Sequence, residues 1–500
     1  MFIFAFILLL TAFLPCLLVS LKLDMDLAGL TRLYVPVAAV IIAVFAVVAI
    51  VRMVRSGQKK EPSNLIEHLK GSWMILLPAV LLWGFCLYAG FSDVSDNTEE
   101  IVATTLAKGD IYVYSAFTGE MMTAGQPIFN KVLIMPMFYS VICNLTHIPF
   151  KIPAYIVFTI VFFGNLRIVS RIKKEMPGAE GEAGHRAFML MYMLVLLAGT
   201  YLPSFGLPVT LGYSVLRMGY SGYGVAFGLS IPLCILLFMK KKYIPGILAL
   251  SSIAGLLRID RIYYNLLELG NSVTAVNSVG KLAYLYIIAA AVLLILRFRK
   301  EQVSLFVFLI PSVTVSEAFV RLSGLVKTKK ERIVLFAGAA FLILMAGNFA
   351  IMSDMDPGQR MLKARASEAS ALIPSGSKVL ACENFMADVR RVNASIRTAY
   401  SRATLDTRLA GLDFEEVTEN YWDYRVFTDY YGNEERVFPY YDIENVPSLL
   451  EMAKMAVGDG VSAFVIPEEK NGKYEKDSFA KAGFEYVGTA GGYCVYCLPR

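Results

Sequence analysis

The chain has 500 residues, of which 56% are hydrophobic, and its mean hydropathy is +0.56. Soluble domains are less apolar than this, so the composition argues against a purely soluble protein and indicates a polytopic membrane protein with a soluble part. The net charge of +6 conceals a division: residues 1–352 carry 30 basic and 18 acidic side chains, whereas residues 353–500 carry 17 basic and 23 acidic ones. Basic residues in a membrane domain follow the positive-inside rule, so no nucleic-acid partner is expected.

We expect a mainly α-helical fold, in which a polytopic transmembrane domain of about nine to eleven spans (1–352) precedes a small soluble α/β domain (353–500). The apolar segments expected to span are 2–21, 33–51, 73–91, 152–169, 187–202, 224–239, 243–257, 283–296, 303–326 and 333–352. The first segment lacks the basic start and the cleavage site of a signal peptide, so we expect it to be retained. Basic residues between 52 and 70 place that loop, and with it the amino terminus, in the cytoplasm.

The orientation of the last span is ambiguous. Strict alternation puts residues 327–332 outside and the tail domain inside. The charges that flank the last span indicate the opposite, because four basic residues within 327–332 precede it and Asp354 and Asp356 follow it. Flanking charges bear directly on the orientation of a span, so we expect an extracytoplasmic C-terminal domain at the cytoplasmic membrane. One weak segment between 243 and 326 then does not cross.

The outer loop after the third span, 92–131, contains a cluster of four acidic residues: Asp93, Asp96, Glu99 and Glu100. Carboxylates at a membrane boundary are costly unless they face water or take part in chemistry. If Asp96 caps a helix, it shares one face with Glu99 and Glu100. Two interpretations stay open: the acids begin a short interfacial helix, or they form a catalytic or metal-holding cluster of a membrane transferase.

The apolar segment 132–148 is short, and a second crossing there would break the alternation of the spans, so we expect it to be interfacial or re-entrant. In the tail, helical and extended patterns alternate, which indicates a small α/β domain with a partly parallel sheet. The expected helices are 361–372, 388–398, 446–457 and 474–481, and the expected strands are 378–382, 461–466, 484–488 and 493–498. Cys494 and Cys497 fall on the last strand, where they point to opposite faces, so a redox motif is not expected.

Several segments together resemble a group of bacterial polytopic membrane proteins with a GT-C-type glycosyltransferase layout. The segments that carry the resemblance are Asp93–Glu100, IYVYSAFTGE (111–120), PIFNKVLIMPMFYSVICNLTHIP (127–149), LRMGYSGYG (216–224), FLIPSVTVSEAFVRL (308–322), IPSGSKVLA (373–381), GVSAFVIP (460–467), and the closing AGFEYVG and YCVYCLP. The D-x-D of that family occurs in other places, at Asp24-Met25-Asp26 and Asp354-Met355-Asp356.

The resemblance implies transfer of a sugar from a polyprenyl-phosphate-linked donor to an envelope glycan or protein acceptor. It implies Asp96 as the base, with Glu99 or Glu100 as its neighbour, and a divalent metal (Mg²⁺ or Mn²⁺) at Asp93 and Asp96. The donor phosphate would be bound by a cationic side chain near the membrane surface. The substrate-binding candidates, all in outer loops, are the cationic residues Arg217 and Arg258, together with Tyr220.

Two other functions stay open. One is a non-enzymatic envelope protein whose outer domain binds a partner through the Tyr-rich, acidic segment 413–442. The other is a transporter or flippase, which predicts internal repeats and broken helices at the membrane midplane. The sequence contains no evident internal repeat, and Glu317 is the one acid clearly within an expected span.

Overall fold

The structure is a computed structural model that describes residues 2–21, 25–55, 65–89, 98–111, 133–176, 181–197, 201–202, 207–208, 215–257, 281–298, 303–324, 326, 328–346, 357–381, 385, 389–390, 392–398, 457–458, 460–468 and 476–499. The chain forms two compact units. Unit 1 comprises residues 1–23, 30–96 and 133–355, and unit 2 comprises residues 24–29, 97–132 and 356–500. Residues 97–132, which follow the third apolar helix, therefore belong to the same unit as the C-terminal domain.

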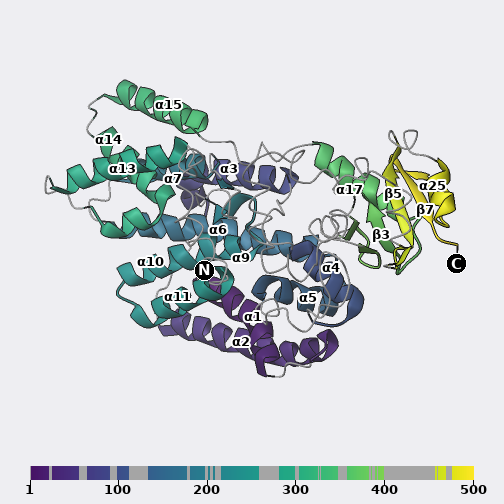
Figure 1. Ribbon diagram of the computed structural model, residues 1–500. Helices are drawn as coiled ribbons and strands as arrows, with labels where there is room; N and C mark the ends of the chain where they lie inside the picture. Colours follow the sequence, from purple (N-terminus) through teal and green to yellow (C-terminus); the bar gives the residue numbers. More distant parts are fainter. Residues whose placement is uncertain are drawn as a thin grey trace. The chain divides into compact units, whose positions relative to one another are not determined.

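Unit 1 is built almost entirely of helices (Figure 1). Its first half contains α1 (Phe2–Leu21), α2 (Leu27–Arg55), α3 (Leu65–Ala89), α5 (Ile134–Thr146), α6 (Lys151–Glu175) and α7 (Glu182–Leu197). A short antiparallel pair, β1 (Tyr201–Leu202) and β2 (Leu207–Pro208), follows. The second half contains α9 (Gly222–Val225), η3 (Ala226–Ser230), α10 (Ile231–Met239), α11 (Tyr243–Leu257), α13 (Lys281–Phe298), η5 (Leu305–Leu309), α14 (Pro311–Gly324) and α15 (Lys329–Ala346).

Among the described residues, three helices are long and apolar enough to cross a membrane: Leu27–Val48, Lys151–Glu175 and Gly222–Met239. Five apolar helices are shorter: Ala5–Val19, Trp73–Tyr88, Ile134–Thr146, Tyr243–Ile253 and Ile288–Arg297. Large apolar side chains stay exposed on several helices, as at Val40, Leu81 and Ile244 (62%, 64% and 78% exposed). Extended apolar surface of this kind is consistent with membrane association.

The expected span 303–326, in which Pro311 predicts a kink, is not one continuous helix in the structure. A 3-10 turn, η5, comes first, and α14 then begins at Pro311 and runs for 14 residues. Proline suits the first position of a helix, where its missing N–H costs nothing and its fixed φ is already helical. At 1.5 Å per residue α14 is roughly 21 Å long, shorter than the roughly 30 Å hydrocarbon core of a bilayer. Pro311 is therefore a helix start and not a kink.

Unit 2 contains a five-stranded sheet with the order β4-β3-β5-β7-β6. Its elements are α4 (Thr98–Lys108), α17 (Pro357–Ser370), β3 (Lys378–Ala381), β4 (Arg397–Thr398), β5 (Ala463–Pro467), α25 (Lys476–Lys481), β6 (Glu485–Ala490) and β7 (Tyr493–Cys497). β3 pairs in parallel with β4 and β5, while β7 pairs antiparallel with β5 and β6. The expected partly parallel α/β domain is confirmed, except that the expected helix 388–398 ends in strand β4.

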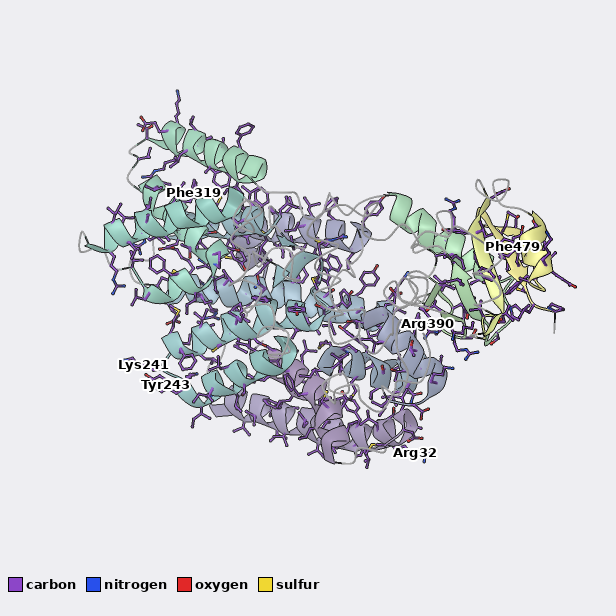
Figure 2. The ribbon with its side chains drawn as sticks, in the orientation of Figure 1. Arg32, Lys241, Tyr243, Phe319, Arg390 and Phe479 are labelled. Atoms are coloured by element: carbon purple, nitrogen blue, oxygen red, sulfur yellow. The ribbon has the colours of Figure 1, made fainter. Side chains whose placement is uncertain are left out.

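Aromatic side chains form part of the core of this sheet domain. Phe479 of α25 stacks on Tyr496 of β7 with their ring centroids 4.4 Å apart (Figure 2). Phe464 of β5 packs edge-on against Phe484, at 4.8 Å. All five residues of β7 are buried, including the free thiols Cys494 and Cys497. The expected helix 446–457 lies almost entirely outside the described residues, as does the Tyr-rich segment 413–442.

Candidate functional sites

The helix expected in the acidic loop is α4. It begins at Thr98, so Glu99 and Glu100 are its second and third residues, where carboxylates interact favourably with the positive end of the helix dipole. Glu99 is half-buried. Asp93 and Asp96 lie outside the described residues, so both interpretations of the acidic cluster stay open.

One face of α4 is buried. Thr98, Val102 and Thr105 recur at helical spacing on this face, and each is at most 4% exposed. The start of α2 joins the same unit, and the N–H of Leu27, its first residue, donates a hydrogen bond to the Gly109 carbonyl at 2.9 Å. The segment at the start of α2 (24–29) and the segment after α3 (97–132) thus both belong to unit 2.

Arg390 connects α4 to the C-terminal part of the chain. Its side chain is 1% exposed (labelled in Figure 2) and donates hydrogen bonds to the Thr104 hydroxyl and to the carbonyl oxygens of Ala394 and Ile396. A buried guanidinium is tolerated when its N–H groups have hydrogen-bond acceptors, and these three oxygen atoms are acceptors for some of them. α4 is therefore a structural component of the C-terminal domain.

The predicted substrate-binding residues Arg217 and Tyr220 lie in unit 1, in the segment that leads into α9, and each is 2% exposed. The Tyr139 hydroxyl of α5 donates a hydrogen bond to the Tyr220 carbonyl at 2.6 Å. The Phe150 ring packs edge-on against both tyrosine rings, at 5.2 and 5.9 Å. Arg217 is thus enclosed by protein. The third substrate-binding candidate, Arg258, lies outside the described residues.

The helix after Arg217 is interrupted by a π-helical segment, η3. Ser221 caps the start of α9, which precedes η3, and its side-chain oxygen accepts a hydrogen bond from the Gly224 N–H at 3.2 Å. Within η3, the Gly228 carbonyl accepts a hydrogen bond from the Asn165 amide at 3.0 Å, and the Asn165 carbonyl oxygen accepts one from the Tyr192 hydroxyl at 2.7 Å. π-Helical turns inside α-helices occur frequently at functional sites, and here the buried network holds one in place.

Arg217 also interacts electrostatically with the last turn of α3. Its charge acts on the thiol of Cys86, a fully buried residue in the last turn of that helix. The acidic stretch begins at Asp93, four residues beyond the end of α3 at Ala89. Glu99 and Glu100 belong to unit 2, whereas Arg217 and Tyr220 belong to unit 1.

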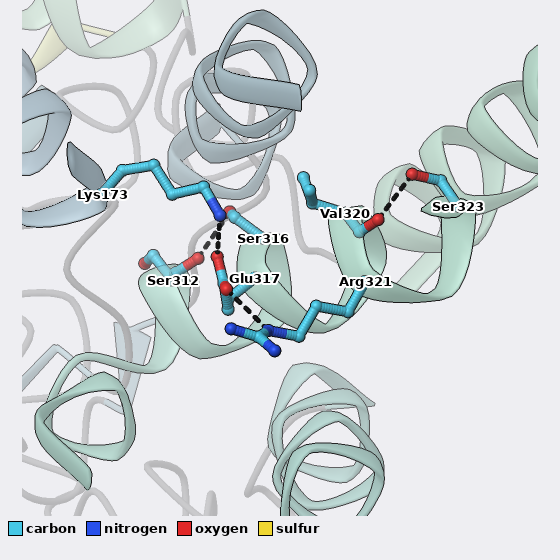
Figure 3. A network of polar contacts seen from close by, with 7 residues as sticks. All are labelled: Lys173, Ser312, Ser316, Glu317, Val320, Arg321 and Ser323. Carbon is cyan, nitrogen blue, oxygen red and sulfur yellow. Dashed lines mark hydrogen bonds and ion pairs between the residues drawn. The ribbon is translucent and has the colours of Figure 1, made fainter. Parts of the chain in front are cut away.

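A second polar centre in unit 1 joins α6 to α14 (Figure 3). Lys173 Nζ lies 2.6 Å from Glu317 Oε2, and Arg321 Nε lies 2.8 Å from Glu317 Oε1. The three side chains are 2%, 1% and 11% exposed, and their formal charges sum to +1. Lys173 Nζ also lies 5.5 Å from the centroid of the Phe188 ring. We call Lys173, Glu317 and Arg321 the ion cluster.

The sequence provides only part of the signal for the ion cluster. Glu317 and Arg321 are four residues apart on one helix, a spacing at which they are expected to pair. Lys173 lies 144 positions away and belongs to a run of basic residues that the positive-inside rule already explains.

The first turn of α14, next to the ion cluster, is rich in hydroxyl groups. Ser312, Thr314 and Ser316 are all fully buried. The Thr314 hydroxyl donates to the Ile310 carbonyl at 3.1 Å, and the Ser316 hydroxyl donates to the Ser312 carbonyl at 2.6 Å. The Ser312 hydroxyl has no hydrogen-bond partner within the part of the chain that the structure describes.

A histidine lies close to the basic end of α6. His185, in the first turns of α7, is within 3.2 Å of the Ser170 hydroxyl. Burial lowers the pKa of His185, and the charges of Lys174 and Lys173 lower it further. The ring is therefore neutral at neutral pH, and it adds no charge to the ion cluster.

The described residues contain no group of three or more His, Cys, Asp or Glu side chains that would hold a metal ion. The proposed metal ligands Asp93 and Asp96 lie outside that part of the chain. No protein-family model matches the chain, and no curated protein matches it.

Proposed function

We propose that the protein is a GT-C-type membrane glycosyltransferase of the cell envelope that uses a polyprenyl-phosphate-linked sugar donor. The observation that carries this proposal is the electrostatic effect of the buried Arg217 on Cys86, in the last turn of α3. That helix leads directly into the acidic stretch that starts at Asp93. A guanidinium at the base of a carboxylate-rich outer loop is the combination that a phosphate-linked donor and a hydroxyl acceptor require.

In this proposal, Asp96 is the general base, with Glu99 and Glu100 as its neighbours on the first turn of α4. Arg217 binds the donor phosphate, with Arg258 behind it, because a guanidinium forms bidentate hydrogen bonds with phosphate. Tyr220 lines the same segment. Asp93 and Asp96 offer carboxylate oxygens, the ligand type that Mg²⁺ and Mn²⁺ prefer, and such a metal would neutralise phosphate charge.

The proposed topology places α4 and the C-terminal domain together on the outer side of the cytoplasmic membrane. Support comes from unit 2, which contains the loop after α1, the loop after α3 and the C-terminal domain. If α1 and α3 both run outward, these two loops share a side, and the domain that packs with them shares it too. In this proposed topology α14 is the segment between 243 and 326 that does not cross the membrane, so that the alternation of spans agrees with the charges around the last span.

The proposal is tested with Asp96→Asn and Arg217→Gln in the full-length protein, compared with Asp110→Asn as a control in the same outer loop. The expected result is loss of the envelope glycan, or of sugar transfer from a polyprenyl-phosphate donor, in the two site variants at normal protein levels. Unchanged glycan in Asp96→Asn would favour the non-enzymatic interpretation, in which the outer domain binds an envelope partner.

A second candidate function is transport of a lipid-linked or anionic substrate. The observation that favours it is the presence of two interrupted helices in unit 1, at η3 and at the η5–α14 junction. Broken helices with buried polar groups are typical of transporter binding sites. Movement of a labelled lipid-linked sugar across proteoliposomes without acceptor would distinguish transport from transfer.

A further inference from the structure

The start of α14 has the chemical character of an anion-binding site. α14 is a helix of 14 residues, so its first turn carries the positive end of a helix dipole. Ser312, its second residue, is 0% exposed, and its hydroxyl has no hydrogen-bond partner among the residues that the structure describes. A buried hydroxyl without a partner is costly, and a bound group that accepts its hydrogen bond removes that cost.

The neighbouring charges select an anion over a cation. The ion cluster lies one turn farther along α14, and its charges sum to +1. Figure 3 shows Ser312 at the start of α14, one turn before Ser316 and Glu317, with its carbonyl oxygen bonded to the Ser316 hydroxyl. Glu317 is already paired with two cations, so the cluster has an excess positive charge. This charge and the helix dipole both favour a negative ligand at Ser312.

The surroundings of this turn indicate how a ligand reaches it. Arg297, at the basic end of α13, donates a hydrogen bond to the Val303 carbonyl at 2.7 Å. This bond connects the residues just before η5 to the basic end of α13. Lys173, at the basic end of α6, holds the middle of α14. The start and the middle of the η5–α14 segment thus adjoin the basic ends of α13 and α6, which the positive-inside rule assigns to the cytoplasmic side. Leu305 and Leu309 of η5 are 59% and 60% exposed, as for a lipid-facing turn.

From these observations we propose that the first turn of α14 binds a phosphate group, with the Ser312 hydroxyl as a direct donor and with Lys173 and Arg321 supplying the attractive field. The phosphate enters from the cytoplasmic half of the membrane, either as a free anion or as the headgroup of an anionic lipid. This site is independent of the proposed transferase site, which involves Arg217 and the outer loop.

The test uses the full-length protein, with two probes that separate the two sources of phosphate. Equilibrium dialysis against radiolabelled inorganic phosphate, in detergent, measures binding of the free anion. Native mass spectrometry of protein from nanodiscs with and without phosphatidylglycerol measures retention of an anionic lipid. Saturable binding of either probe to the wild type is expected. Loss of one hydrogen bond to a charged group in Ser312→Ala should weaken it about tenfold or more.

Ser323→Ala is the matched control. Ser323 lies at the other end of α14, and its hydroxyl is already bonded to the Val320 carbonyl at 2.7 Å, so this variant should bind like the wild type. Ser312→Ala removes only a hydroxyl, and thermal unfolding of each variant checks that the fold is kept. Phosphate or lipid binding that is equal in Ser312→Ala and the wild type would overturn the proposal. So would the absence of binding of both probes to the wild type.

Discussion

The guanidinium of Arg390 donates a hydrogen bond to the hydroxyl of Thr104, a residue 286 positions earlier in the chain. Through this contact α4 becomes part of the sheet domain. Residues near the acidic cluster and residues of the C-terminal domain are consequently coupled in stability. Four predictions follow from this and related contacts.

The first prediction concerns Arg390 itself. Replacing Arg390 by Ala leaves the Thr104 hydroxyl and two buried carbonyls without this donor, so we expect unit 2 to lose about 3–5 kcal/mol of stability. Thr104→Val should cost about 1–3 kcal/mol. Limited proteolysis and thermal unfolding of the purified protein measure both effects.

Thr105→Val is the control for Thr104→Val. The Thr105 hydroxyl bonds to the Ile101 carbonyl within α4 itself, so its loss should cost less than the loss of the Thr104 hydroxyl. Equal effects of the two valine substitutions would show that the contact with Arg390 contributes nothing to stability.

The second prediction concerns the buried ion pair. Glu317→Gln leaves Lys173 buried without its carboxylate, so we expect a loss of about 3–5 kcal/mol, as for other buried pairs from which one partner is removed. Charge reversal of both residues, Lys173→Glu with Glu317→Lys, should restore part of the loss. The midpoint of thermal unfolding in detergent gives the comparison.

Glu182→Gln serves as the control, because Glu182 also pairs with a cation but is 87% exposed. An exposed pair of this type contributes roughly 0–1 kcal/mol. The idea of a buried structural pair fails if Glu317→Gln is as mild as Glu182→Gln.

The third prediction concerns Gly224, which follows the Ser221 cap. A Cβ atom at this position would overlap the Met218 backbone carbonyl, so Gly224→Ala forces the backbone before the π-helical segment to move. We expect a loss of more than about 2 kcal/mol, typical of overpacking against rigid atoms. Expression level and thermal unfolding report the effect.

Gly338 in α15 is the counterpart, because nothing lies within 4 Å of a Cβ atom there. Gly338→Ala should stabilise the helix by about 0.5–1 kcal/mol, since alanine has the higher helix propensity. The opposite ranking of these two variants would contradict the close packing around Gly224.

The fourth prediction concerns topology. Single cysteines are placed at exposed positions of a cysteine-free background: Ala107→Cys in α4, Ala480→Cys in α25 and Thr328→Cys before α15. The first two should react with a membrane-impermeant maleimide in intact cells, whereas Thr328→Cys should react only after permeabilisation. Labelling of Thr328→Cys in intact cells would show that α14 crosses the membrane.

Local patterns in the sequence predict much of the fold. The bounds of α1 and α11 agree with the apolar segments 2–21 and 243–257, and the strands 461–466, 484–488 and 493–498 recur as β5, β6 and β7. These elements are fixed by hydrophobic periodicity and turn residues within the element itself. The segment 303–326 was harder to predict, because Pro311 is compatible with both a kinked helix and a helix start.

The contacts that define the candidate sites are not local. Lys173 pairs with a residue 144 positions away, and Asn165 bonds to Gly228, 63 positions away. Pairings of this kind depend on which helices pack together, which periodicity does not encode. The sequence therefore indicates Glu317 as unusual, and its pairing with Arg321, without identifying Lys173 as its second partner.

The contact between Thr104 and Arg390 also has a consequence for synthesis. At roughly 5–20 residues per second, α4 leaves the ribosome roughly 15–60 seconds before its partner is made. During that interval the Thr104 hydroxyl is without the guanidinium that later binds it. Assembly of unit 2 is therefore a late step of biogenesis, and premature termination anywhere after α4 leaves an incomplete domain for quality control to recognise.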